Sequence, residues 1–317
     1  MDAGRFPLLQ IGLRLGAGAL VAAGVVVLAA FATAYLTVYP LRRSRWWRSS
    51  RMRTSGAGPV RIPNGRGHQD RHVRFSGVDG LELAGTYLDR QAEATVVLCH
   101  GWPGSQDDML GLAGTLADAG FNVLTFDFRG WGESDVGPVT LGCREARDVI
   151  GAVEYARGQP AARPHRIGVF GLSMGAAASL LAAAECPQIE AVVADSSYTC
   201  LDRAVRGAFR GLWGFAAPVF FVPTRWLGER LIGTAMSDVS PLRAITRISP
   251  RPVLIIHGTR DRLIDVREAR ALYQASGDPK ALWLIEGADH AEARWVAQGE
   301  YDRRVAGFFR EHLRGQA

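Results

Sequence analysis

A serine between two glycines is the first group in this sequence that could do covalent chemistry. The segment Gly-Leu-Ser-Met-Gly at 171–175 follows the apolar run 166–170 and opens a run of helix formers, 176–185. The two glycines allow a tight, strained turn from strand to helix, so the hydroxyl of Ser173 would stand clear of the sheet. The amide of Met174, at the start of the helix, could then donate to an oxyanion. The pattern predicts a nucleophile elbow suited to acyl transfer.

A serine nucleophile needs a base to take its proton and a carboxylate to orient that base. The expected strand 253–256 runs into a loop that contains Asp261. The expected strand 282–285 runs into a loop that contains His290. The order serine, acid, histidine therefore places all three groups after strands. We predict Asp261 as the acid in preference to Asp265, because Asp261 lies closer to the end of its strand.

His290 competes with six other histidines for the role of base. His100 and His257 also end expected strands, but each precedes a glycine in a turn, which favours a structural role. The remaining four lie in linker or edge contexts: His68, His72, His165 and His312. His290 is therefore the predicted base.

The second oxyanion donor is expected in the loop His-Gly-Trp-Pro-Gly-Ser at 100–105, directly after the expected strand 94–99. Its glycines let the backbone approach a substrate, and the amide of Trp102 is the candidate donor. Pro103 has no amide hydrogen to give. A simple tight turn into the next helix is an alternative that is compatible with this role.

Strands and helices must alternate to position these groups, and the sequence from His72 onward predicts that they do. The segment 94–99 is continuously apolar, which is typical of a strand buried on both faces of a sheet. The other expected strands are 73–75, 81–88, 121–126, 166–170, 189–194, 251–256 and 282–285, and the expected helices are 107–119, 141–156, 176–185, 266–275 and 291–313. This alternation predicts an α/β fold with a mostly parallel sheet, whose ligands bind at the carboxyl ends of the strands.

Together these motifs resemble the α/β-hydrolase superfamily. They are the loop 100–105, the segment Asp-Phe-Arg-Gly-Trp-Gly-Glu-Ser at 127–134, the elbow, His-Gly-Thr-Arg-Asp at 257–261 and Gly-Ala-Asp-His at 287–290. Within the superfamily, the chain looks most like membrane-anchored bacterial serine hydrolases that are similar to eukaryotic α/β-hydrolase-domain proteins. A serine at the elbow argues against haloalkane dehalogenases, which place an aspartate there.

The resemblance covers roughly residues 72–314 and implies an α/β-hydrolase fold with a cap insertion. It implies Ser173 as nucleophile, Asp261 as acid and His290 as base. The amides of Trp102 and Met174 would form the oxyanion hole. No metal or organic cofactor is implied, and the four cysteines show no CxxC spacing that would indicate a zinc site.

The N-terminal part predicts a membrane anchor that follows a short tail, 1–14. Residues 15–41 contain no charged side chain. This uncharged run is longer than the ~20 residues that a helix needs to cross a bilayer. Two arginines precede this run and six follow it closely, so the positive-inside rule predicts a single-pass protein with its large domain in the cytoplasm. A cleaved signal peptide ending at 32–34 is the alternative, which the long apolar run and the arginines after it disfavour.

The positive charge of the chain is concentrated in the predicted juxtamembrane linker, 42–71. The net charge is +6, and residues 42–53 alone hold six arginines and no acid. Such a linker would be attracted to anionic headgroups. From Phe75 onward there are 25 basic and 29 acidic residues, so we expect no nucleic-acid partner, because such a partner requires positive charge spread over a folded face.

The predicted cap insertion, about 198–241 within the domain 72–317, contains the uncharged stretch 211–224 with four aromatic residues. At 14 residues this stretch is too short to span a membrane. Five arginines flank it: Arg203, Arg206, Arg210, Arg225 and Arg230. One hypothesis is that the cap faces the bilayer and admits acyl-chain or lipid substrates; the alternative is that it only closes over the core.

The sequence as a whole predicts a serine hydrolase that cleaves carboxylic esters or thioesters through an acyl-serine. A serine peptidase of the prolyl-oligopeptidase type is one alternative, although such enzymes usually carry a propeller domain and the residues before 72 are too few to form one. A non-catalytic, membrane-tethered scaffold with the hydrolase fold is the other. The presence of every candidate catalytic group disfavours the scaffold.

Overall fold

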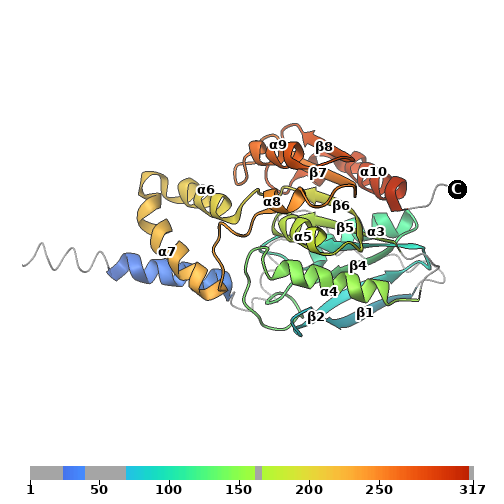
Figure 1. Ribbon diagram of the computed structural model, residues 1–317, viewed down its shortest axis with the longest axis horizontal. Coiled ribbons are helices and arrows are strands. Elements are labelled where there is room, and N and C mark those ends of the chain that lie inside the picture. The colour runs from blue at the N-terminus through green and yellow to red at the C-terminus, as the bar shows by residue number, and fades with distance from the viewer. Residues whose placement is uncertain (1–23, 40–68, 161–165, 314–317) are drawn as a thin grey trace, which may run out of the picture.

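The computed structural model describes residues 24–39, 69–160 and 166–313. Its centre is an eight-stranded sheet in the order β1-β2-β4-β3-β5-β6-β7-β8 (Figure 1). The strands are β1 Gln69–Ser76, β2 Glu82–Asp89, β3 Ala94–Cys99, β4 Asn122–Phe126, β5 Arg166–Leu172, β6 Ile189–Asp195, β7 Val253–Gly258 and β8 Lys280–Ile285. β1 pairs antiparallel with β2, and β2 pairs antiparallel with β4. All later pairs are parallel, so the carboxyl ends of β3 to β8 meet at one edge.

Helices cover both faces of this sheet, as an α/β fold requires. α4 Glu145–Arg157, α5 Met174–Glu185, α8 Pro241–Ile245 and α9 Val266–Ala275 follow one another across one face. α3 Leu110–Asp118, preceded by the short 3-10 helix η1 Gln106–Met109, and α10 Ala293–Leu313 lie together on the other. The central strand β3 is buried along its whole length, because it has a helix layer above and below it.

The predicted cap insertion forms two helices that stand away from the sheet between β6 and β7. They are α6 Leu201–Trp213 and α7 Ala217–Ile232, joined by the 3-10 helix η2 Gly214–Ala216 (Figure 1). A small apolar cluster ties the base of the cap to the body: Ala177, Tyr198, Leu201, Met236, Val239 and Ile264. Because Ala177 belongs to α5 and Ile264 lies just before α9, the cap is packed against the elements that follow the expected serine and acid.

Residues 24–38 form a helix whose end is attached to the body of the fold. The backbone N–H of Val139 donates to the carbonyl oxygen of Val38 at 2.8 Å. No helix among the described residues is long and apolar enough to cross a membrane. Residues 15–23 and 40–41 of the predicted span lie outside the described ranges, as do the tail 1–14 and most of the linker 42–71. The transmembrane helix and its cytoplasmic orientation therefore stay predictions.

Several expected boundaries were wrong, and three of them bear on the linker, the cap side of the sheet and the final helix. β1 begins at Gln69, inside the stretch assigned to the linker. The helix expected over 141–156 begins only at Glu145, because Leu141 and Gly142 have positive φ and the Glu145 carboxylate accepts from the amides of Thr140 and Gly142. The final helix begins at Ala293 and has a non-helical residue, Gln298, inside it.

Candidate active site

Ser173 stands at a strained turn between β5 and α5. Its φ of 54° and ψ of −112° lie in a region that residues with a side chain rarely adopt. A Cβ on Gly171 would come within 2.3 Å of the Gly175 carbonyl oxygen, and one on Gly175 within 2.3 Å of the Cys99 carbonyl oxygen. Only glycine fits either position, so the two flanking glycines are a steric requirement of the predicted elbow.

The loops after β5, β7 and β8 bring the three predicted residues into one hydrogen-bonded chain. The Oγ of Ser173 lies 2.9 Å from Nε2 of His290, and Nδ1 of His290 lies 2.7 Å from Oδ2 of Asp261. The serine and the histidine are 117 positions apart in the sequence. Their order and geometry are those of a nucleophile, a base and an orienting carboxylate.

Asp261 is held so that one oxygen remains for the histidine. Its Oδ1 accepts the backbone N–H groups of Leu263 at 2.9 Å and Ile264 at 2.7 Å, which leaves Oδ2 directed at His290. Asp265, the competing candidate, instead begins α9 and accepts the amide of Arg267 at 2.9 Å. Asp261, and not Asp265, is therefore hydrogen-bonded to His290, and its role as the acid stays a prediction that this geometry supports.

His290 is positioned by a neighbour that the sequence analysis did not single out. Oδ1 of Asp289 accepts the backbone N–H of His290 at 2.8 Å and that of Arg262 at 2.9 Å. Asp289 therefore joins the loop after β7, which carries Asp261 and which we call the acid loop, to the loop after β8, which carries His290. These backbone donors hold the pKa of Asp289 at about 2. Its place directly before His290 was the only available signal, because its second donor is 27 positions away.

A buried carboxylate lies behind the site. Asp195 ends β6, and its carbonyl oxygen accepts the backbone N–H of Ser173 at 2.8 Å. Its side chain accepts the hydroxyl of Tyr301 on α10 at 2.6 Å and that of Ser196 at 2.8 Å. Burial raises the pKa of Asp195, an effect that the two hydroxyls oppose. The sequence analysis missed this pair, because 106 positions separate Asp195 from Tyr301.

The loop 100–105 lies against the elbow, as the oxyanion prediction requires. A Cβ on Gly101 would be 3.4 Å from the Leu172 carbonyl oxygen and 3.6 Å from Cβ of Ser173. Met174 is the first residue of α5, and first-turn amides have no acceptor within their own helix. The roles of the Trp102 and Met174 amides stay predictions that this proximity supports.

The two other histidines that end strands are buried and occupied by structural contacts. Nδ1 of His100 lies 2.7 Å from the Gly101 carbonyl oxygen, and its Nε2 accepts the N–H of Phe128 at 3.1 Å, which fixes a neutral tautomer. Burial lowers the pKa of His100. Nε2 of His257 lies 2.8 Å from the Ile264 carbonyl oxygen and 3.3 Å from Oδ2 of Asp261. His100 therefore has structural contacts only, whereas His257 also contacts the predicted acid.

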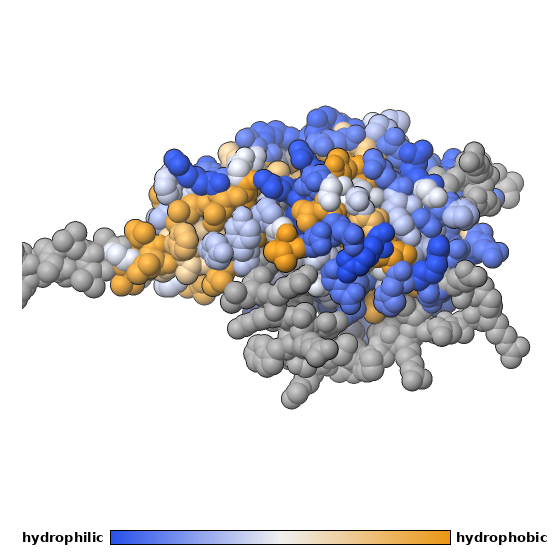
Figure 2. Space-filling view, turned by 90° about the horizontal axis from the view of Figure 1, so that it is seen from below, coloured by the Kyte–Doolittle hydropathy of each residue, from blue (hydrophilic) through white to orange (hydrophobic). Residues whose placement is uncertain are grey.

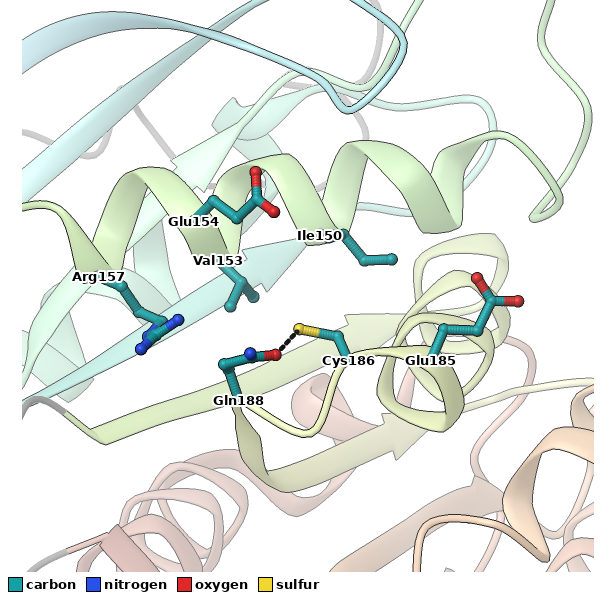
Figure 3. Close-up of a pocket in the computed structure, with 7 residues that line it drawn as sticks. All are labelled: Ile150, Val153, Glu154, Arg157, Glu185, Cys186 and Gln188. Atoms are coloured by element: carbon teal, nitrogen blue, oxygen red, sulfur yellow. Dashed lines mark hydrogen bonds between the residues drawn. The ribbon is translucent and has the colours of Figure 1, made fainter.

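A shallow pocket elsewhere on the surface takes no part in this site. It encloses about 170 Å³ between α4 and the segment after α5 (Figure 3). Cys186 donates a hydrogen bond to Gln188 there, and Arg157 also lines the pocket. α5 begins next to Ser173 and ends just before Cys186, so the pocket is about 18 Å, one length of this helix, from the serine. Within the described ranges, no group of three or more potential metal ligands is present either.

Comparison with known proteins relates the chain to a hydrolase family and to bacterial proteins of similar sequence. The family described as "Serine aminopeptidase, S33" matches residues 90–239, which include the oxyanion loop and the elbow. The uncharacterized protein YqkD of Bacillus subtilis is 30% identical over 235 residues, or 72% of this chain and 75% of YqkD. The uncharacterized protein YfhR of Salmonella typhimurium is 28% identical over 251 residues, or 76% of this chain and 79% of YfhR.

Two solved structures share the fold. The esterase Pf2001 of Pyrococcus furiosus matches with a TM-score of 0.65 and 28% identity, over 78% of this chain and 94% of the esterase. The acylaminoacyl peptidase of Pyrococcus horikoshii matches with a TM-score of 0.59 and 20% identity, over 79% of this chain and 42% of the peptidase. The second likeness speaks to the fold alone.

Proposed function

The chain belongs to the α/β-hydrolase superfamily, and we propose that it is a serine hydrolase that cleaves carboxylic esters or thioesters through an acyl-serine. The observation that carries this proposal is the continuous hydrogen-bonded chain from Ser173 through His290 to Asp261. The likeness to the Pyrococcus furiosus esterase supports the same chemistry.

In the proposed acylation step, Nε2 of His290 takes the proton from Ser173 as Oγ attacks the substrate carbonyl carbon. The carbonyl oxygen becomes an oxyanion that the amides of Met174 and Trp102 would stabilise. The tetrahedral intermediate then collapses, the bond to the leaving group breaks, and His290 gives its proton to the departing alkoxide or thiolate. The product of this step is an ester between the acyl group and Ser173.

In the proposed deacylation step, His290 takes a proton from water, and the resulting hydroxide attacks the acyl carbon. His290 then protonates Ser173 as the acyl–oxygen bond breaks, which releases the acid and restores the enzyme. Asp261 accepts from Nδ1 of His290 throughout, so it keeps the neutral ring in the tautomer whose Nε2 can accept a proton. Every proton in this scheme is carried by the chain's own residues or by water.

Acyl-chain substrates are the proposed substrate class, and the cap supports this. Trp213 and Phe220 stack with ring centroids 4.1 Å apart, and Phe209 contacts Phe221 edge-on at 5.7 Å. This aromatic content gives the cap a large apolar surface beside the site. The cap is tied to α9, the helix after the loop of Asp261, because Arg203 of α6 pairs with Glu268 of α9 at 3.2 Å.

A peptidase is the second candidate, since the matching family is described as a serine aminopeptidase. Esters and peptides share the same acylation step, so the same three residues would serve both. The two activities differ in the leaving group of the substrate. Measured turnover of substrates with different leaving groups therefore decides between them.

The proposal is tested by labelling the purified full-length protein with a fluorophosphonate probe, beside the Ser173→Ala variant. We expect labelling of the first and none of the second, with circular dichroism showing that both are folded. Turnover of p-nitrophenyl esters, acyl thioesters and aminoacyl anilides would then rank the leaving groups. Folded protein without serine-dependent labelling would leave the non-catalytic scaffold as the better explanation. Preference for the anilides would favour the peptidase.

A further inference from the structure

The helix 24–38 presents an apolar face that the rest of the described chain leaves uncovered. Its buried side chains recur every fourth residue, at Ala30, Ala34 and Val38, so one stripe of the helix is packed. Six other large apolar side chains are exposed: Val25, Val27, Leu28, Phe31, Tyr35 and Leu36. The helix has no charged residue.

The two threonine hydroxyls on this helix are satisfied within the helix itself. The hydroxyl of Thr33 donates to the Ala29 carbonyl oxygen at 2.8 Å, and that of Thr37 donates to the Thr33 carbonyl oxygen at 2.7 Å. Neither hydroxyl therefore needs water as an acceptor. A helix whose side-chain donors are satisfied in this way pays little desolvation free energy when its outer face enters an apolar medium.

The cap adds a second set of exposed apolar side chains. Phe215 in η2 is 100% exposed and Leu212 at the end of α6 is 77% exposed. Trp213, Val219, Val222 and Trp226 are also exposed. Figure 1 draws the helix 24–38 alongside α7, and Figure 2, from a perpendicular direction, shows hydrophobic surface concentrated at this same end of the molecule. We call the helix 24–38 together with residues 212–226 the apolar end.

The apolar end is bordered by positive charge. Residues 202–230 contain five arginines and two acids, Asp202 and Glu229, so their net charge is +3. Arg225 pairs with both acids. Arg206 lies over the ring of Phe221 at 4.7 Å from its centroid, and Arg230 lies over the ring of Trp226 at 4.5 Å. The guanidinium group of Arg206 also pairs with Asp202 at 3.1 Å, and the excess of arginine over acid leaves this part of the cap with a net positive charge that anionic headgroups would attract. In the sequence, six further arginines follow the helix at 42–53.

We propose that the apolar end is a docking surface for an anionic lipid bilayer, into which the side chains of η2 and the start of α7 insert beside the helix 24–38. Large exposed apolar areas rimmed by cationic side chains are typical of interfacial membrane binding. The uncharged run in the sequence extends back from this helix to residue 15, which favours lipid as the occupant. A symmetric contact between two copies would bring the same arginines face to face, which is unfavourable.

The experiment places a fluorescent reporter at the depth that the proposal specifies. A nitrobenzoxadiazole probe is attached to a cysteine at Phe215→Cys in the full-length protein, with the labelled wild type as the background for native cysteines. Because Phe215 is fully exposed, its replacement removes no packing. The matched control is Trp295→Cys on α10, whose side chain is also exposed.

With vesicles of phosphatidylcholine and phosphatidylglycerol, we expect the probe at 215 to brighten and to be quenched by lipids that carry a doxyl group in the acyl chain. The probe at 295 should show neither change. This difference between positions tests the docking of the cap separately from any attachment through residues before 24. Equal responses at the two positions, or no response at 215, would overturn the proposal.

Two further outcomes would also contradict it. A probe at 215 that is already bright before vesicles are added, and unchanged by them, would indicate that a second copy covers the surface. Equal quenching in vesicles of phosphatidylcholine alone would overturn the assignment to an anionic membrane. As a second variant, Leu212→Asp together with Phe215→Asp should lower vesicle partitioning of the cap, read by a probe at Val219→Cys, by at least ~tenfold. Unchanged partitioning would contradict insertion.

Discussion

Asp261 and Asp265 lie four positions apart but have different partners. Asp261 is buried and shares its oxygens between two backbone amides and His290, whereas Asp265 is bonded to Arg267 and begins α9. A carboxylate that orients a histidine must offer it an oxygen. Oδ2 of Asp261 lies 2.7 Å from Nδ1 of His290 and 3.3 Å from Nε2 of His257, whereas both oxygens of Asp265 accept from Arg267. The difference between the two residues therefore lies in their surroundings and not in their chemistry.

We predict that Asp261→Asn lowers kcat by about 10⁴-fold, because the amide would donate to Nδ1 of His290 and favour the wrong tautomer. Asp265→Asn is the matched control. Asparagine is as good as aspartate at the start of a helix, so the free energy of unfolding should change by less than about 1 kcal/mol and activity should persist. Ester hydrolysis and urea unfolding of both variants measure this. A large loss of kcat in Asp265→Asn with Asp261→Asn active would reverse the assignment.

At the scale of elements, the site depends on contacts between loops that belong to different strands. The elbow after β5 packs against the backbone at the end of β3, and the loops after β7 and β8 are joined through Asp289. The parallel sheet brings all of these loops together at one edge. A change in one loop can therefore displace the loops that contact it only slightly. Steric fit at the elbow and hydrogen bonding between the last two loops are the features that can be tested.

At the elbow, Gly175→Ala should lower the free energy of unfolding by at least ~3 kcal/mol, since the new methyl group would overlap the backbone of β3. Gly114→Ala in α3 is the control, because no described atom outside its chain neighbours and the backbone of its own helix lies within 4 Å of the position that the new methyl group would take. There we expect a gain of ~0.5–1 kcal/mol from helix propensity. Urea denaturation measures both, and equal stability of the two variants would contradict the packing argument.

For the joined loops, we predict that Asp289→Asn reduces stability near neutral pH but makes little difference in acid. The folded pKa of Asp289, about 2, lies below the ordinary value of 3.8, so the charged form stabilises the fold above that value. This contribution is lost as pH falls from about 4 to about 2. The difference in unfolding free energy between wild type and variant, measured by urea denaturation across this range, should therefore shrink. A difference that is constant with pH would mean that the charge of Asp289 does not matter.

At the scale of the whole molecule, the cap connects the apolar end to the elements that carry the candidate site. The helix 24–38 is attached through Val38 and Val139, and the cap is packed on Ala177 and Ile264, which lie near Ser173 and Asp261 in the sequence. This order places the proposed membrane surface and the proposed acyl-chain substrates on the same side of the protein. The cap is the element that both properties share.

We predict that Phe220→Ser lowers kcat/KM on dodecanoyl esters about tenfold more than on acetyl esters, because only the long chain would reach the aromatic side chains of the cap. Phe220 is better suited than Phe221, whose buried ring contacts Phe209 and Arg206 and stabilises the cap itself. Steady-state kinetics on a series of p-nitrophenyl esters measure this. The acetyl ester serves as the internal control, and an equal loss on both esters would argue against acyl-chain binding by the cap.

The sequence by itself predicted the α/β fold and the positions of Ser173, Asp261 and His290. It could do so because each lies in a short segment with its own signal: the glycines of the elbow, or an apolar strand that ends in a turn. The same reasoning placed the start of α4 too early, because the preceding turn is fixed by the side chain of Glu145 and not by helix propensity.

Only the tertiary structure decided which distant residues complete the site and which apolar surfaces lie together. Tyr301 bonds Asp195 across 106 positions, and the helix 24–38 and the cap are more than 160 positions apart in the chain. No local pattern encodes such pairs, since they arise from the order in which strands join the sheet. The elbow could be recognised from five residues, whereas the partners that hold and surround it required the fold.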